Sequence, residues 1–181
     1  MKIYQKSTAL ILSLAVLFCG SAPVFADSTS NNLGSDSVIT TKIKTKMMAD
    51  PSISSLNINV QTNNGRVALA GTVPTDNEAT AAIITAESTA NVKSVDASKL
   101  VVQQSSQPFA DTVITAKIKG LYLRDKVFGD KPISVVGISV ETKDGVVSLT
   151  GKATSTEAKS AVRLAKTIDG VKKVNSTIVV G

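Results

Sequence analysis

The sequence predicts an α+β protein built from two tandem α-β-β-α-β domains, each a three-stranded mixed sheet packed against two helices. Three observations predict this fold. The segment Ser37 to Lys44 returns almost unchanged as Thr112 to Lys119. After each copy come two alternating apolar runs around a glycine turn, and then a capping motif with an apolar stripe. Because a period of about 75 to 80 residues is too long for a solenoid unit, we expect each copy to bury its own core.

The N-terminal segment is typical of a secretory signal peptide. The charged start, Met1 to Lys6, precedes the apolar run Ala9 to Phe18 and small residues up to Ala26. We therefore expect cleavage after Ala26 and a periplasmic mature protein. Since Cys19 lies within the discarded segment, no lipid anchor is expected. Residues 27–35 are small and polar, and we expect them to form a flexible leader.

The expected mature chain contains neither histidine nor cysteine. The whole sequence has 20 basic and 14 acidic residues, and removing Lys2 and Lys6 leaves a net charge of 18 − 14 = +4. Without these side chains the chain cannot form a Ser-His-Asp triad, a thiolate nucleophile or a Cys- or His-ligated zinc site. A pair of carboxylates across a cleft is formally possible, but modules this small leave little room for a cleft. The sequence therefore predicts a protein that is not an enzyme and has no cofactor or metal.

Each repeat is expected to begin with an amphipathic helix. In the first copy, Asp36 is predicted to cap this helix, and Ile39, Ile43 and Met47 recur every four residues with Val38 beside them. The equivalent cap and stripe of the second copy are Asp111, Ile114, Ile118, Leu121 and Tyr122.

A β-hairpin is expected next. Apolar residues alternate with polar ones from Leu56 to Val60, and the chain then turns and alternates back. Gly65 and Gly145 are predicted to form the tight turns of the two hairpins. Gly71 and Gly151 are predicted to end strands or to allow a helix to approach closely. No ligand role is expected for these four structural glycines.

A second helix and a third strand complete each repeat. Thr75 and Thr154 both stand three residues before a glutamate, which is the capping-box spacing, so a helix is predicted to start at each. Asn91 and Gly170 are predicted to end these helices, because both residue types tolerate a left-handed backbone. The third strands are expected at residues 92–102 and 171–180.

The two expected domains differ in charge. They span residues 36–102 and 110–181, with a linker at 103–109. Residues 35–102 carry six basic and six acidic groups, whereas the second domain carries twelve basic and seven acidic groups, a net charge of +5. The copies are therefore expected to share a fold but to present different surfaces.

Six segments of the two copies match a known family: Asp36 to Lys44, Val67 to Gly71, Val92 to Val95, Asp111 to Lys119, Asp144 to Gly151 and Asp169 to Val174. On these segments both copies resemble the BON domain, a family named for bacterial osmotic-stress and nodulation proteins. The resemblance implies a non-enzymatic periplasmic protein linked to osmotic or envelope stress, with domains that contact phospholipid surfaces. A chaperone-like role, holding partly unfolded envelope proteins, is the alternative that it implies. It supplies no catalytic residues, and the family's glycine after the second strand falls on Gly71 and Gly151.

The candidate contact surface is a cationic segment near the start of the second copy, without a counterpart in the first. It combines cations with an aromatic tip, which favours an anionic headgroup interface. In the alternative interpretation, Tyr122 completes the helix stripe and Phe128 folds back over the core. Nucleic acid is not an expected partner, since stacking aromatics are scarce and the protein is expected to be exported. The candidate residues for peripheral contact with an anionic phospholipid membrane or a protein partner are Lys117, Lys119, Tyr122, Arg124, Lys126, Phe128 and Lys131.

Overall fold

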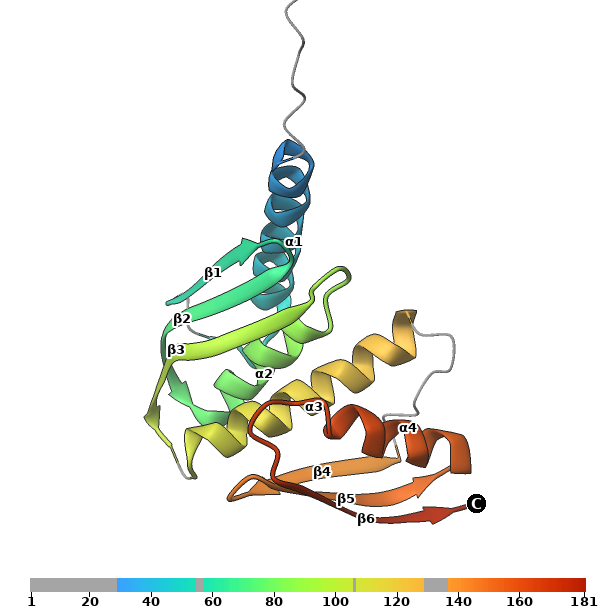
Figure 1. The fold of residues 1–181 in the computed structure, drawn as a ribbon. Helices are drawn as coiled ribbons and strands as arrows, with labels where there is room; N and C mark the ends of the chain where they lie inside the picture. Colours follow the sequence, from blue (N-terminus) through green and yellow to red (C-terminus); the bar gives the residue numbers. More distant parts are fainter. Residues whose placement is uncertain (1–28, 55–56, 106, 129–136) are drawn as a thin grey trace, which may run out of the picture.

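The computed structural model of the chain describes residues 29–54, 57–105, 107–128 and 137–181. The order α-β-β-α-β occurs twice (Figure 1), so the predicted α+β class is confirmed. The elements are α1 (Thr29–Ala49), β1 (Ile58–Asn63), β2 (Arg66–Thr75), α2 (Asp76–Glu87), β3 (Ser94–Gln104), α3 (Phe109–Phe128), β4 (Ile138–Lys143), β5 (Val146–Ala153), α4 (Ser155–Ala165) and β6 (Lys173–Val180).

The strands form two mixed sheets with the orders β1-β2-β3 and β4-β5-β6. In each sheet the first two strands are antiparallel, and the second and third are parallel because a crossover helix joins them. Val60 lies opposite Leu69, and Val67 lies opposite Val95, and all four side chains are buried. The alternation predicted for the hairpins therefore sets which face of each sheet meets the helices.

Both hairpins close through a two-residue turn with positive φ at both positions. The φ angles are 52° at Asn64 and 78° at Gly65, and 53° at Asp144 and 78° at Gly145. Such turns match the right-handed twist of paired strands, and asparagine, aspartate and glycine adopt them most readily. The predicted turn glycines are thus placed where the backbone requires them.

Gly71 and Gly151 have a different role from the expected one. They lie inside β2 and β5 rather than at strand ends, with φ angles of +132° and +128°. A Cβ at either position would collide with the carbonyl oxygen of Asn57 or Gly137, which belongs to the chain entering the first strand of the same sheet. The close neighbour is therefore backbone rather than a helix, and no residue other than glycine fits.

The first helix begins earlier than predicted. Residue Thr29 already starts α1, so the leader expected over residues 27–35 is helical from that point on. This stretch contains no proline, and adding a turn to an existing helix costs little compared with nucleating one. Asp36 therefore lies within α1 and is not its cap, and Asp111 lies in the first turn of α3.

The N-caps of the second helices are as predicted. The Thr75 side chain accepts a hydrogen bond from the Glu78 backbone N–H at 3.3 Å. At Thr154 the reciprocal capping box is complete, because the Glu157 carboxylate also accepts from the Thr154 backbone N–H at 2.8 Å. The helices end earlier than predicted, at Glu87 and Ala165, with C-caps Ser88 and Lys166. Asn91 and Gly170 lie in the loops that follow, where both adopt the positive φ expected of them, 69° and 91°.

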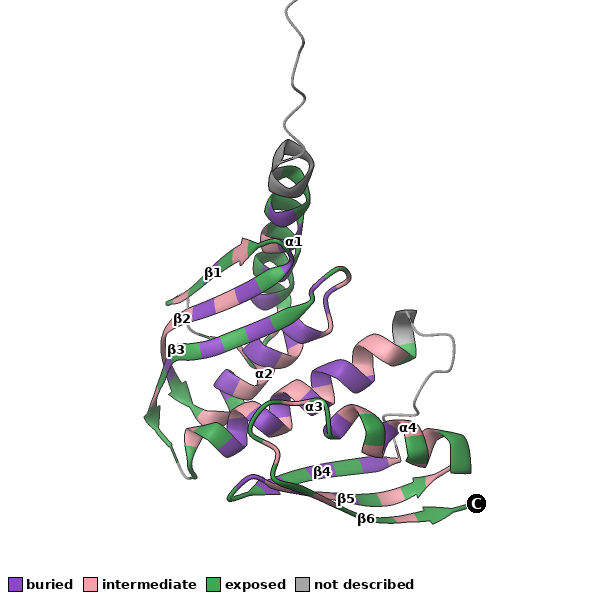
Figure 2. Cartoon of the chain, in the orientation of Figure 1, coloured by how far each residue is buried: buried purple, intermediate pink, exposed green. Residues whose placement is uncertain are grey.

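Each copy contains its own cluster of buried apolar side chains (Figure 2). Ile43 is fully buried in the first cluster, and Ile118 occupies the equivalent position in the second. Val38, which was expected beside the first stripe, is 52% exposed. Successive residues on a helix point about 100° apart, so the neighbour of the buried Ile39 turns toward solvent.

Helices α2 and α3 join the two copies and lie side by side between the sheets (Figure 1). Ala116 is fully buried in the core of the first copy, and Phe109 and Val113 pack against that core. The same helix places Ile114 and Ile118 in the core of the second copy. The sheets therefore keep separate cores, as predicted, whereas α3 contributes to both.

Candidate functional site

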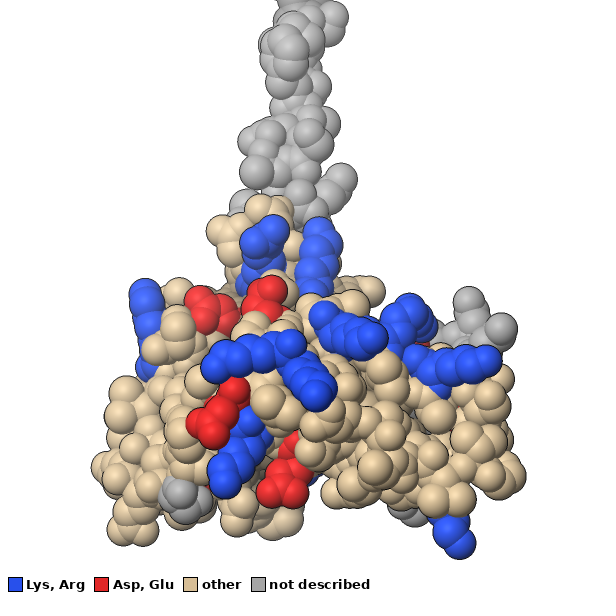
Figure 3. Space-filling view, turned by 60° about the horizontal axis from the view of Figure 1, so that its bottom comes forward, with Lys and Arg blue, Asp and Glu red and all other residues tan. Residues whose placement is uncertain are grey.

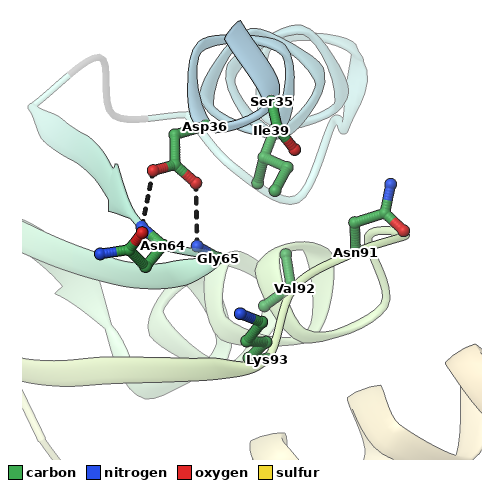
Figure 4. Close-up of a pocket in the computed structure, with 8 residues that line it drawn as sticks. All are labelled: Ser35, Asp36, Ile39, Asn64, Gly65, Asn91, Val92 and Lys93. Atoms are coloured by element: carbon green, nitrogen blue, oxygen red, sulfur yellow. Dashed lines mark hydrogen bonds between the residues drawn. The ribbon is translucent and has the colours of Figure 1, made fainter. Parts of the chain in front are cut away.

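One carboxylate from the first helix of each copy holds the hairpin turn. The Asp36 oxygens accept hydrogen bonds from the backbone N–H groups of Asn64 at 2.6 Å and Gly65 at 2.8 Å (Figure 4). Asp36 and Asn64, together with Asn91 and Lys93 from the loop after α2, line a shallow pocket of about 300 Å³. Since each Asp36 oxygen accepts a backbone N–H of the turn, this carboxylate acts as a structural clamp of the hairpin.

The second copy repeats the clamp. Asp111 accepts from the backbone N–H groups of Asp144 at 2.8 Å and Gly145 at 2.9 Å. In both copies the loop after the crossover helix also donates to the turn glycine, through the backbone N–H of Lys93 or Lys172 at 2.8 Å. Each turn is thus bonded both to the first helix of its copy and to the loop that precedes the third strand.

Tyr122 does not belong to an exposed contact surface. Its side chain is fully buried, and its hydroxyl donates to the carbonyl oxygen of Ala161 in α4 at 2.8 Å. Burial raises the pKa of this hydroxyl above its usual value. Tyr122 completes the apolar stripe of α3, so its assignment to membrane contact is wrong.

Arg124 serves the junction between the two copies. Its Nη1 donates to the carbonyl oxygens of Val92 at 2.7 Å and Glu87 at 3.3 Å, and lies 3.7 Å from Glu87 Oε2. Lys117, which is half-buried, is also close enough to lower the pKa of Glu87. Arg124 is therefore an interface residue between α3 and the end of α2, which corrects its expected role.

Gly120 allows α2 and α3 to approach closely. A Cβ at this position would lie 2.5 Å from the Cβ of Glu87 and 3.3 Å from the Cα of Ile84. No role was predicted for Gly120 from the sequence. The signal was present, because a glycine inside an amphipathic helix weakens that helix and usually has a packing reason.

The other predicted contact residues are dispersed. Lys126 is exposed near the end of α3, whereas Lys119 is half-buried and lines a groove of about 520 Å³ between the copies, with Ile84. Phe128 is the last residue of α3, and its side chain lies outside the described part of the structure, as does Lys131. The seven candidates therefore do not form one surface.

A second set of cations in the same copy was missed. These side chains are exposed, and they lie four and three residues apart, so they share one face of α4. The helical periodicity that predicts the apolar stripe of this segment also places these charges on one face, which is the signal that could have found them. The residues are Lys159, Arg163 and Lys166.

Within residues 29–54, 57–105, 107–128 and 137–181, no group of three or more His, Cys, Asp or Glu side chains could hold a metal ion. None of the four helices described is both long and apolar enough to cross a membrane.

Comparison with known proteins identifies both repeats. The family model described as "BON domain" matches residues 35–104 and 110–181. The chain is 33% identical over 161 residues to the osmotically-inducible protein Y of Escherichia coli (strain K12), covering 84% of this chain and 77% of that protein. It is 31% identical over 119 residues to the outer membrane lipoprotein DolP of Haemophilus influenzae, covering 65% of this chain and 59% of that protein.

A solved structure is also similar, at a low level. The C-terminal domain of CdsD, a structural protein of the type III secretion system of Chlamydia trachomatis, aligns over 78% of this chain and 96% of its own length. The sequence identity is 13% and the TM-score is 0.31.

Proposed function

The chain belongs to the BON domain family, and on this basis we propose that it is an exported binding protein of the cell envelope that acts in osmotic or envelope stress. It works without catalysis, and its second copy contacts anionic phospholipid surfaces reversibly. Family membership and the names of the two relatives, one osmotically inducible and one an outer membrane lipoprotein, support the envelope role.

The observation that carries the lipid proposal is the unbalanced charge of the second copy. Residues 110–181 hold twelve basic and seven acidic side chains. Arg124 pairs with Glu87, and Lys117 acts on the same carboxylate, so these two cations serve the junction between the copies. Other described cations of this copy are exposed and can meet a partner, among them Lys126, Lys159, Arg163 and Lys166. Figure 3 shows Lys and Arg side chains spread over one face of the molecule, with acidic side chains among some of them. Each cation near an anionic membrane contributes about 1 kcal/mol at physiological salt.

Sedimentation with lipid vesicles tests this proposal. We expect the protein to bind phosphatidylglycerol vesicles, to bind phosphatidylcholine vesicles much more weakly, and to dissociate as salt rises, because screening weakens attraction between exposed charges. Equal binding to both lipids, or no binding to either, contradicts the proposal. If the protein instead suppresses aggregation of a partly unfolded client without lipid, the chaperone-like alternative is supported.

A further inference from the structure

The repeat provides an internal comparison between α2 and α4. Their N-caps, Thr75 and Thr154, align the two helices residue by residue. In this alignment Arg163 replaces Ile84, and Lys166 replaces Glu87. One apolar position and one acidic position of the first copy are thus both cationic in the second.

The same face of the two helices has different surroundings. On α2, Ile84 and Glu87 face Gly120 of α3, and Arg124 bonds to Glu87. On α4, whose residues are all described, only Ala161 and Ala165 are buried. The face of α4 that corresponds to the covered face of α2 is therefore open.

The outer face of α4 is cationic without compensating acid. Lys159, Arg163 and the C-cap residue Lys166 share it with small hydroxyl residues, and all three are exposed. The only carboxylate of the helix, Glu157, accepts hydrogen bonds from Thr154 in the capping box. In the described part of the chain, no carboxylate lies within 4.0 Å of any of the three cations.

We propose that this outer face of α4 is the surface through which the second copy docks on anionic phospholipid, an inference that rests on the proposed function. Its chemistry matches phosphate headgroups, since cations attract them and no insertion is required. A protein partner generally needs an apolar or aromatic centre at its interface, and this face has none. This face also does not suit a partner helix that packs as α3 packs on α2. A cation at the position of Arg124 would then lie beside Lys166 instead of beside a glutamate.

The cations of α3 are less suited to the same task. Arg124 is bonded to Glu87, and Lys117 is half-buried beside the same carboxylate. Withdrawing either from the junction would leave a buried carboxylate with fewer partners. The three cations of α4 have no such commitment, so they can turn to a membrane without loss of internal contacts.

The test compares two triple variants of the full chain in phosphatidylglycerol vesicle binding. K159Q/R163Q/K166Q is expected to bind about 100-fold more weakly than the unaltered protein, from three cations at the usual contribution of each. The matched control, K42Q/K44Q/K99Q, removes the same charge from exposed positions of the first copy and is expected to change affinity by less than about threefold. The single variant R163Q, expected to lose about fivefold, covers the case in which the triple variant does not fold.

The outcomes separate the inference from the proposed function. If the unaltered protein binds vesicles and the α4 variants bind equally well, the α4 surface is wrong while lipid binding stands. If the control loses as much affinity as the α4 triple variant, only net charge matters and the assignment to α4 also fails. If the unaltered protein binds no vesicles but binds polyglutamate, and the α4 triple variant loses that binding, the partner is an acidic protein. Both proposals are then overturned.

Discussion

Glu87 is the buried charge at the junction of the two copies. Its exposed fraction is 3%, and Arg124 and Lys117 are the cations near it. Burial raises the pKa of this carboxyl above its ordinary value of 4.5, and the two cations oppose that shift without cancelling it. The ionised carboxylate is therefore less favourable in the folded chain than in the unfolded chain.

The sign of the resulting pH dependence follows from this direction. A carboxyl with a raised folded-state pKa contributes stability below its unfolded pKa and loses it as the pH rises through the folded pKa. Between about pH 4 and about pH 7, the free energy of unfolding should therefore contain a falling component from Glu87. Glu87→Gln cannot titrate and should lack this component, which urea unfolding of both proteins at the two pH values measures.

The comparison with the variant is essential because other carboxyls act in the opposite sense. Hydrogen bonds from Ser52 and Ser98 lower the pKa of Asp50 and Asp96. The stability that these two carboxylates contribute to the folded chain is therefore lost as the pH falls. Asp50 and Asp96 are unchanged in Glu87→Gln, so their contributions cancel when the pH profiles of the two proteins are subtracted. Parallel pH profiles for the two proteins would show that Glu87 is not responsible.

At the scale of the element, the hairpin depends on a single carboxylate from a neighbouring helix. Asp36 and Asp111 each accept two backbone hydrogen bonds from a turn. Asn in place of Asp has only one acceptor oxygen, so one backbone N–H loses its partner, at a cost of about 1–3 kcal/mol. We expect Asp36→Asn and Asp111→Asn to destabilise the chain by this amount.

Amide hydrogen exchange locates the effect of each variant. Asp36→Asn should accelerate exchange at Gly65, and Asp111→Asn should accelerate exchange at Gly145. The control is Asp169→Asn, which changes an exposed side chain and should alter neither turn. Acceleration at both turns by either variant would mean that the hairpins do not depend on separate clamps.

Elements were predictable from the sequence where the signal is local. The alternation in the hairpins and the threonine caps depend on neighbouring residues, and Thr154 forms its predicted capping box. The contact surface was not predictable from sequence proximity. Residues close in a helical segment point in different directions, so Tyr122 faces the core, Arg124 faces the first copy and Lys126 faces solvent.

At the scale of the whole molecule, the two copies pack as a layer of helices between two sheets (Figure 1). The repeated sequence pattern indicated two self-contained modules, because it contains only the residues that the two copies have in common. The junction between the copies depends on residues that differ between them. Gly120 and Arg124 in α3 correspond to Thr45 and Ala49 in α1, where no second module packs.

Gly120→Ala tests this junction, because the sign of its effect on the free energy of unfolding depends on whether α2 packs closely against α3. In a helix without a close neighbour, alanine is more favourable than glycine by about 1 kcal/mol. At Gly120 the added Cβ would lie 2.5 Å from the Cβ of Glu87, so α2 and α3 must separate. We therefore expect a lower free energy of unfolding and a larger radius of gyration in small-angle scattering.

The chain offers a matched control within another helix. Gly34 lies in α1, and a Cβ there would meet no atom within 4 Å, so Gly34→Ala should leave the radius of gyration unchanged and should not destabilise the chain. If Gly120→Ala instead behaves like this control, the two copies do not depend on the close packing of α2 and α3. In that case the open face of α4 could not be explained by comparison with a covered face of α2. The Gly120 experiment therefore tests the internal comparison from which the membrane-docking surface was inferred.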